Sequence, residues 1–186
     1  LDKLTSLSLD FCPFLNDAAL RYLLPRCPAL RSLSLEGCEN VTLHSFIGVK
    51  LPALTRLSLE SGSFSHPETL FGIIRHFPKL TYLNLKWCGG AGGELLEKLG
   101  KNQTLPHLEA LIFSHATPIT PEQMHSFATT HPSLKHISIT WQKTLTAAAL
   151  RPLTEACNNI ESLNLTGNRG LEEEGLVKVL APLKRL

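Results

Sequence analysis

The stretch of the sequence with the strongest chemical signature is KWCGGAGGELLEKLG, residues 86–100. It follows a strand-like segment, YLNLKW, and precedes a helix-like one, ELLEKLG. Strand, glycine loop and helix is the order in which backbone N–H groups cradle phosphate. The stretch lacks the Gly-Lys-Ser/Thr ending of a P-loop and the later acidic residue of a dinucleotide site. We therefore predict a turn, in which the glycines allow a loose helix start or the close approach of another chain; phosphate binding is the alternative.

Cysteine and histidine are the other residues that could do chemistry, as metal ligands or nucleophiles. The five cysteines and eight histidines form no C-x-x-C or H-E-x-x-H motif, and the odd, scattered cysteines do not make a disulfide framework. Cys12, Cys38 and Cys88 recur at one spacing, which favours small buried residues with weak S–H donors over redox or metal roles. Three histidines beside prolines are expected to be solvated: His66, His107 and His131. We expect no enzyme activity, no cofactor and no metal site.

Composition restricts the class of protein further. The chain has 186 residues, of which 43% are hydrophobic and 18% charged, as in a folded, soluble protein. Its net charge of +2 gives no argument for nucleic acid or an anionic membrane. No apolar run approaches the roughly 18 residues of a membrane span. We predict an intracellular protein, cytoplasmic or nuclear, with neither nucleic acid nor membrane as partner.

The elements that position all these residues are set by a repeat. Seven segments share the pattern L-x-x-L-x-L or a close variant, and an eighth begins at Leu183, with starts 23 to 28 residues apart. The seven are LTSLSLDFC from Leu4, LRSLSLEGC from Leu30, LTRLSLESG from Leu54, LTYLNLKWC from Leu80, LEALIFSHA from Leu108, LKHISITWQ from Leu134 and IESLNLTGN from Ile160. Alternating apolar residues predict a short strand in each segment, followed by a returning helix. This pattern resembles a leucine-rich repeat.

The resemblance implies an α/β solenoid, a horseshoe arc with short parallel strands on the concave face and helices on the convex face. We expect residues 1–186 to form a single leucine-rich-repeat domain of seven repeats plus the start of an eighth. We also expect it to be part of a longer chain, because Leu4–Leu15 and Leu183–Leu186 would leave apolar ends uncovered. Helix starts are predicted by two capping boxes, Thr120–Gln123 and Ser65–Glu68, and by the acidic run Glu172–Glu174.

The cysteines carry a finer resemblance. CPALRSLSLEGCENVT, residues 27–42, is similar to the cysteine-containing subclass of these repeats, best known from F-box/leucine-rich-repeat proteins, the substrate receptors of cullin-RING ubiquitin ligases. The match is good over residues 1–90. Later, other residues replace the cysteine (Ala116, Gln142 and Asn168), and LNLTGNRGLEEEGL is closer to the ribonuclease-inhibitor type.

The resemblance implies a non-catalytic protein–protein interaction module: the substrate-recognition domain of an F-box type (SCF) ubiquitin ligase. Its protein partner would bind the concave face, and a ubiquitin-ligase adaptor would bind an F-box upstream of residues 1–186, which contain none. The alternative is a structural scaffold subunit of a large multiprotein assembly. A receptor for a small ligand such as an inositol phosphate would need a basic ring, and only Arg56 and Lys86 occupy outward strand positions.

Two sets of residues on the predicted concave face are candidates for partner binding. The acidic column, Asp10, Glu36 and Glu60, would stack three carboxylates about 5 Å apart, with Arg56 expected to neutralise part of the charge. The second set is aromatic and contains both tryptophans of the chain: Tyr82, Trp87, His115, His136 and Trp141. Exposed Trp and Tyr are typical of interface hot spots. The alternatives are a solvated acidic face and tryptophans that fold over their own turns to cover the core.

Overall fold

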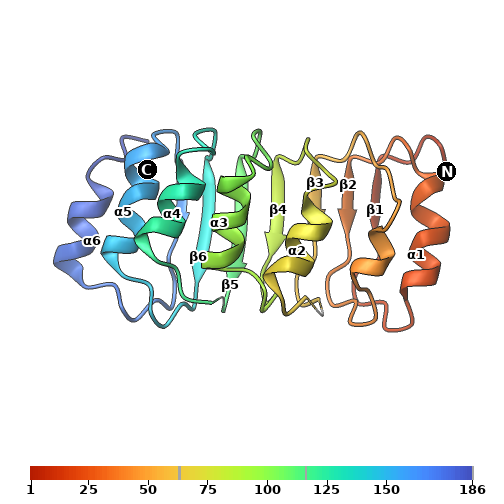
Figure 1. The fold of residues 1–186 in the computed structure, drawn as a ribbon, viewed down its shortest axis with the longest axis horizontal. Helices are drawn as coiled ribbons and strands as arrows, with labels where there is room; N and C mark the ends of the chain where they lie inside the picture. Colours follow the sequence, from red (N-terminus) through yellow and green to blue (C-terminus); the bar gives the residue numbers. More distant parts are fainter. Residues whose placement is uncertain (63, 116, 186) are drawn as a thin grey trace.

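The computed structural model describes residues 1–62, 64–115 and 117–185. In these residues seven parallel strands form one sheet, and each strand pairs with the next along the chain. The strands are β1 (Ser6–Ser8), β2 (Ser32–Ser34), β3 (Arg56–Ser58), β4 (Tyr82–Leu85), β5 (Ala110–Ser114), β6 (His136–Thr140) and β7 (Ser162–Asn164). The repeats follow one another along the long axis, from α1 at one end to α6 at the other (Figure 1). The predicted α/β leucine-rich-repeat solenoid is confirmed.

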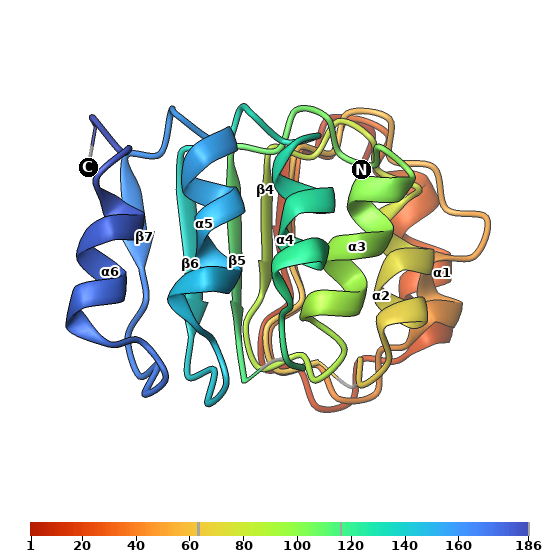
Figure 2. The same cartoon turned by 60° about the vertical axis from the view of Figure 1, so that its left-hand side comes forward.

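The helices lie on one side of this sheet (Figure 2) and leave the other side open. The α-helices are α1 (Asp17–Leu23), α2 (Pro67–Ile74), α3 (Gly93–Lys101), α4 (Pro121–Ala128), α5 (Ala147–Ala156) and α6 (Glu173–Leu180). Two short 3-10 helices complete the described elements, η1 (Leu24–Arg26) and η2 (Leu43–Phe46). The second repeat therefore returns to the sheet through η2, where the other repeats have an α-helix.

The core lies between the sheet and the helices. The second and third apolar residues of each segment point into it, and Leu33, Leu35, Leu57 and Leu59 are at most 1% exposed. Each such side chain contributes about 1.5–3 kcal/mol when fully buried. The strand register aligns the second leucines of successive repeats, for example Leu33 with Leu57. A unit of this kind buries its apolar face only against its neighbours, so stacking supplies the core.

The helix starts are partly as predicted. Thr120 and Gln123 form the expected capping box at α4, with the Thr120 hydroxyl accepting from the Gln123 amide. The box predicted at Ser65 is wrong, because the N-cap of α2 is His66, without a side-chain capping bond. Pro67 is the reason: proline favours the first helical position, which makes the preceding residue the cap. Glu173 and Glu174 occupy the first turn of α6, as expected.

The strand-closing position links each repeat to the one before. The Sγ atoms of Cys38 and Cys88 donate to the carbonyl oxygens of Leu9 and Leu59, at 3.1 and 3.0 Å. In the seventh repeat the Nδ2 of Asn168 donates in the same way to the Ile139 carbonyl oxygen, at 2.6 Å. Ala116, the predicted closing residue of the fifth repeat, lies outside the described residues. Cysteine and asparagine have the same role here because each is a small donor that reaches a carbonyl oxygen of the preceding repeat; Asn168 Nδ2 also donates to the Leu165 carbonyl oxygen, at 2.9 Å.

Cys38 and Cys88 are buried as predicted, but the same prediction is wrong for Cys12, which lies in the first of the seven described repeats and is only partly buried. Cys27, Cys38, Cys88 and Cys157 are buried and Cys12 is partly exposed, and all five are free thiols. Burial raises the pKa of Cys88 to about 11 and that of Cys157 to about 12. Both thiols therefore stay protonated at neutral pH, which disfavours the nucleophilic thiolate form.

The glycine run is a turn packed between neighbouring repeats. A Cβ at Gly90 would lie 2.5 Å from the His66 carbonyl carbon, and one at Gly92 would lie 2.3 Å from Thr117 Oγ1. Gly92 also has a φ of 145°, which few other residues adopt. The backbone that approaches these glycines closely belongs to the adjacent repeats of the same chain. One expected alternative was the close approach of another chain.

His131 differs from its prediction. It is fully buried, not solvated, and its ring stacks on Phe127 with centroids 4.2 Å apart. Its Nε2 lies 2.7 Å from the carbonyl oxygen of Thr104, in the previous repeat. Burial lowers the pKa of His131, against the opposing effect of the Phe127 and Thr104 carbonyls. The neighbouring Pro132 suggested an exposed turn. The helix-to-strand corner that contains His131 is instead packed against the corresponding corner of the previous repeat, which contains Thr104.

Candidate partner-binding surface

The backbone makes the same sharp turn after every strand. Counted from the first leucine of each segment as zero, the residue at position +7 has a left-handed φ between 51° and 78° in all seven repeats. These residues form the edge column: Phe11, Gly37, Ser61, Trp87, His115, Trp141 and Gly167. A bulky residue costs about 1–2 kcal/mol in this conformation, whereas glycine adopts it freely. The tryptophans and Phe11 therefore occupy positions for which the backbone prefers glycine.

Three rings of the edge column stack on one another. The Trp87 and His115 ring centroids are 4.0 Å apart with planes inclined at 20°, and those of His115 and Trp141 are 6.0 Å apart at 6°. We call Trp87, His115 and Trp141 the aromatic stack. Trp87 is 49% exposed and Trp141 48%, so about half of each side chain remains available to another molecule.

The rings lean onto the following repeat. A Cβ at Gly167 would lie 2.6 Å from the Trp141 ring, and one at Gly37 would lie 2.6 Å from the Phe11 ring. Trp87 likewise lies against His115. The alternative in which each tryptophan covers only its own turn is therefore wrong. Glycine at 37 and 167 gives the neighbouring ring the room that a side chain would fill.

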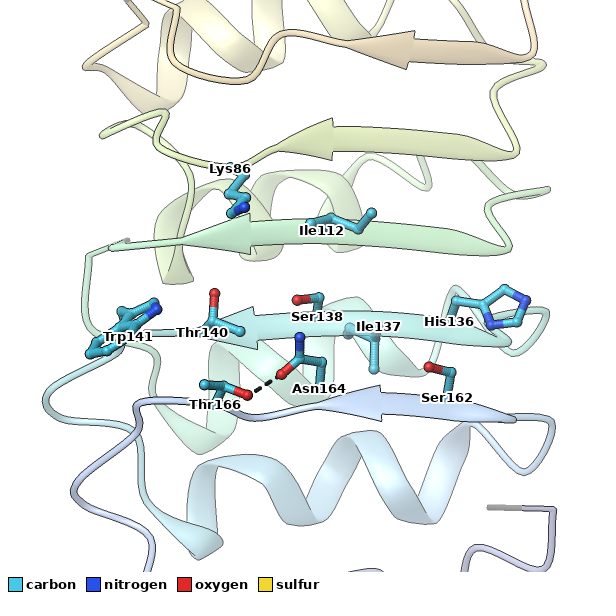
Figure 3. A pocket seen from close by; sticks show the side chains of 10 residues that line it. All are labelled: Lys86, Ile112, His136, Ile137, Ser138, Thr140, Trp141, Ser162, Asn164 and Thr166. Atoms are coloured by element: carbon cyan, nitrogen blue, oxygen red, sulfur yellow. Dashed lines mark hydrogen bonds between the residues drawn. The ribbon is translucent and has the colours of Figure 1, made fainter. Parts of the chain in front are cut away.

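The structure divides the five predicted aromatic residues into two groups. Trp87, His115 and Trp141 meet at the carboxyl ends of the strands, whereas Tyr82 and His136 begin β4 and β6. Figure 3 shows His136 and Trp141 at opposite ends of β6. Tyr82 and His136 share a hollow of about 330 Å³ with five other residues, Arg56, Thr81, Glu109, Ala110 and Ile112.

Arg56 has a different partner from the one predicted. Its guanidinium lies 3.9 Å from the centroid of the Tyr82 ring, a cation–π contact. Burial raises the pKa of Tyr82, while the positive charge of Arg56 acts in the opposite direction. The cation that forms an ion pair with the acidic column is Lys86, whose Nζ is 3.5 Å from Glu60 Oε1.

A larger hollow of about 450 Å³ lies on the open face next to the stack (Figure 3). Its lining comes from four successive repeats of the solenoid, the fourth to the seventh, and is mainly hydroxyl, amide and aliphatic: Lys86, Ile112, His136, Ile137, Ser138, Thr140, Trp141, Ser162, Asn164 and Thr166. Asn164 Oδ1 accepts from the Thr166 amide at 3.0 Å, which fixes one wall. Sequence reasoning did not single out these serines, threonines and asparagines, because their types are equally common on a solvated sheet; their outward strand positions were the available signal.

The two glutamates of the acidic column are hydrogen-bonded to the next repeat. Glu36 Oε1 accepts from Ser58 Oγ at 2.9 Å, and Glu60 Oε2 accepts from Asn84 Nδ2 at 3.0 Å. Ser58 and Asn84 are themselves buried polar residues of the open face. These bonds give a structural reason for carboxylates in adjacent repeats, since each one satisfies a donor of its neighbour.

Asp10 is bound in a similar way. Its Oδ1 accepts from the backbone amide of Glu36 at 2.9 Å and its Oδ2 from Ser8 Oγ at 2.6 Å. Burial by itself would raise the pKa of Asp10, but hydrogen bonds from Ser34, Ser8 and the Glu36 amide outweigh it, and the pKa is lowered. Asp10 is therefore ionised at neutral pH.

Within the residues that the structure describes, no three His, Cys, Asp or Glu side chains are grouped so that they could hold a metal ion. In the same residues no helix has the length and apolar character needed to cross a membrane.

Comparison with known proteins identifies similar sequences. The family model described as "Leucine Rich repeat" matches residues 156–180. The F-box protein FBW2 of Arabidopsis thaliana is 27% identical over 161 residues, which cover 81% of this chain and 49% of that protein. The chain thus spans about half the length of this relative.

Solved structures show the same architecture. An internalin C2 from Listeria monocytogenes superposes with a TM-score of 0.67 at 17% identity, over 98% of this chain and 68% of the other. TLR13, in a complex with ssRNA13, gives a TM-score of 0.61 at 18% identity, over 100% of this chain and 28% of the other. At these identities the likeness establishes the fold alone. The repeat pattern, the sheet topology and these comparisons together show that the chain has the leucine-rich-repeat fold and that its sequence is similar to that of an F-box protein.

Proposed function

We propose that this chain is a non-catalytic protein–protein interaction module whose partner contacts the aromatic stack and the open, concave face. One observation carries the proposal: Trp87 and Trp141 stay half exposed in a left-handed backbone conformation that glycine would adopt without strain. Bulky residues held in such conformations cluster at functional sites. Glycine does occupy the equivalent place in the second and seventh repeats, so the turn itself does not require an aromatic ring.

The geometry suits an extended segment of a partner protein. The stack offers large rigid apolar surfaces that are half exposed, and tryptophan is one of the residues enriched at interface hot spots. The adjoining hollow supplies hydroxyl and amide groups that can bond to a partner's backbone (Figure 3). Tyr82 and His136 would contact the same partner at the other strand ends. Asp10, Glu36 and Glu60 belong to the proposed surface but should contribute less, because their oxygens already accept internal hydrogen bonds.

We further propose that the module is the substrate-recognition domain of an F-box type ubiquitin ligase. The similarity to F-box protein FBW2 and the cysteine-containing repeats support this role. Because the chain spans about half of that relative, contact with a ligase adaptor would be made by another part of the whole protein. The corresponding compartment is intracellular.

Affinity capture of the endogenous full-length protein, followed by mass spectrometry, tests this role. We expect a cullin and its F-box adaptor among the captured proteins, together with peptides from an F-box in the protein itself. A fixed, stoichiometric set of other subunits without a cullin would contradict the ligase role and support the scaffold alternative. Capture with the Trp87→Ala/Trp141→Ala variant tests the site separately. In both the ligase role and the scaffold role, the protein that binds the aromatic stack should no longer be captured with this variant.

A further inference from the structure

A third hollow lies at the opposite edge of the sheet from the aromatic stack. It has a volume of about 330 Å³ and is formed by the segments that lead into β3 and β4, residues 49–54 and 76–79. Its apolar lining comes from Val49, Leu51, Leu54 and Phe77, whose side chains belong to the core and are at most 5% exposed. This hollow shares no residue with the stack or with the two hollows of the open face.

The hollow occurs where the repeat is irregular. The second repeat has the four-residue η2, whereas the fourth to sixth repeats have α-helices of 8 to 10 residues. After η2 the chain becomes extended at Ile47 and turns through Gly48, whose φ is 75°. A Cβ at Gly48 would meet no atom within 4 Å, and Ile47 is 58% exposed. The segment before β3 thus lacks the helical turns that cover this edge in those repeats.

The rim of the hollow is positively charged. Lys50 and Lys79 line it together with His76, and no carboxylate does. All three side chains are exposed. Among the described residues neither lysine forms an ion pair, as is also true of Lys3, Lys143 and Lys184, whereas the other five lysines do: Lys86, Lys98, Lys101, Lys135 and Lys178. An apolar floor between two unpaired cations is complementary to an apolar side chain flanked by carboxylates.

We infer that this hollow is a second interaction surface, which binds a segment of a partner protein with an apolar side chain flanked by acidic residues. The apolar side chain would occupy the hollow, and the acidic residues would pair with Lys50 and Lys79. The surface lies at the amino ends of the strands and the stack at their carboxyl ends, so the two can be occupied independently. The solenoid would then hold two protein segments at once.

Fluorescence anisotropy with two labelled peptides tests this inference. One peptide carries a central Leu-Phe pair flanked on each side by two aspartates, and the other carries lysines in place of the aspartates. We expect the chain to bind the acidic peptide more tightly than the basic one, with an affinity that falls as salt is added. The double variant Lys50→Glu/Lys79→Glu should weaken binding of the acidic peptide about tenfold, because two attractive rim charges become repulsive.

A charge-matched control separates the hollow from the overall charge. Lys143→Glu/Arg169→Glu changes the net charge by the same amount at exposed positions on the other edge, and it should leave the affinity for the acidic peptide nearly unchanged. Amide chemical shifts of Lys50, Leu51 and Lys79 should move on peptide addition, whereas those of Trp87 and Trp141 should not. Equal binding of the two peptides, no binding of the acidic one, or an equal effect of both double variants would overturn the inference. Each outcome is independent of the proposed function, because Trp87→Ala/Trp141→Ala should leave this binding intact.

Discussion

The acidic column and the aromatic stack occupy neighbouring positions of the same turn but are used differently. In the first three repeats each carboxylate accepts hydrogen bonds from its own or the next repeat, and Glu60 also pairs with Lys86. In the fourth to sixth repeats the rings contact mainly one another and leave about half of each tryptophan exposed. The acidic column is hydrogen-bonded within the solenoid, whereas the aromatic stack retains exposed surface for a partner. A column of similar side chains therefore indicates a partner-binding surface only when the contacts of those side chains within the solenoid are known.

The largest effect should come from removing the stack. Trp87→Ala and Trp141→Ala should each weaken partner binding by about 2 kcal/mol or more, roughly 30-fold, because a large apolar contact is lost. The free energy of unfolding should also fall, because alanine keeps the Cβ that is strained at a left-handed φ and loses the packing of the ring on the next repeat. Surface plasmon resonance against the captured partner measures the affinity. Phe14→Ala is the matched control, because Phe14 is 93% exposed and lies outside the stack; an equal loss in that variant would contradict the site.

A second effect, on stability and not on binding, should come from crowding the stack at its end. Gly167→Ala places a Cβ 2.6 Å from the Trp141 ring at a φ of 78°, so we expect a loss of about 2 kcal/mol or more in the free energy of unfolding. Gly48→Ala is a close control, because its φ is 75° but its Cβ meets nothing within 4 Å; it should cost about 1 kcal/mol. Urea unfolding measures both. Equal losses would mean that the ring does not press on Gly167.

The smallest effect should come from the acidic column. Asp10→Asn should lower the free energy of unfolding at pH 7 by roughly 1 kcal/mol, because a charged acceptor of the Glu36 amide becomes neutral. The pKa of Asp10 is lowered from its ordinary value of 3.8 in the folded chain. Its stabilisation is therefore fully present above that value and is lost as the pH falls through the folded pKa. Urea unfolding of both proteins between neutral and strongly acid pH should show the difference vanish.

Partner affinity of the Asp10→Asn variant tests the comparison itself. We expect a change of no more than about twofold, as is typical of exposed charges. A loss as large as that of the tryptophan variants would show that the acidic column is also a principal contact.

The sequence was sufficient to predict the solenoid because the same leucine spacing occurs in seven successive segments. Leucines at a fixed spacing determine the strand, its inward face and its pairing with the next repeat, so one register accounts for all seven strands. The outward positions followed from the same register. The equivalence of Cys88 and Asn168 was less predictable, since it depends on a carbonyl oxygen in the preceding repeat that the spacing alone does not place.

The candidate site was predictable in its residues but not in its arrangement. The repeat register placed Tyr82, Trp87 and Trp141 on the concave face as one aromatic group, but the length of a strand separates the first from the other two. The stack depends on a left-handed φ at the same position of every repeat. In the sequence this conformation is indicated by the glycines at positions 37 and 167. The prediction that His131 is solvated was wrong for a related reason. Burial at a helix-to-strand corner that contains a proline depends on how the corner of the adjacent repeat packs against it.

The most direct test of the central claim uses the fact that the chain has only two tryptophans, both in the stack. Chain labelled with 5-fluorotryptophan should give two ¹⁹F resonances, assigned with Trp87→Phe and Trp141→Phe and observed while unlabelled partner is added. If the stack is the partner site, both resonances should shift or broaden in proportion to the bound fraction. If both remain unchanged while the complex forms, the partner binds elsewhere and the account is wrong.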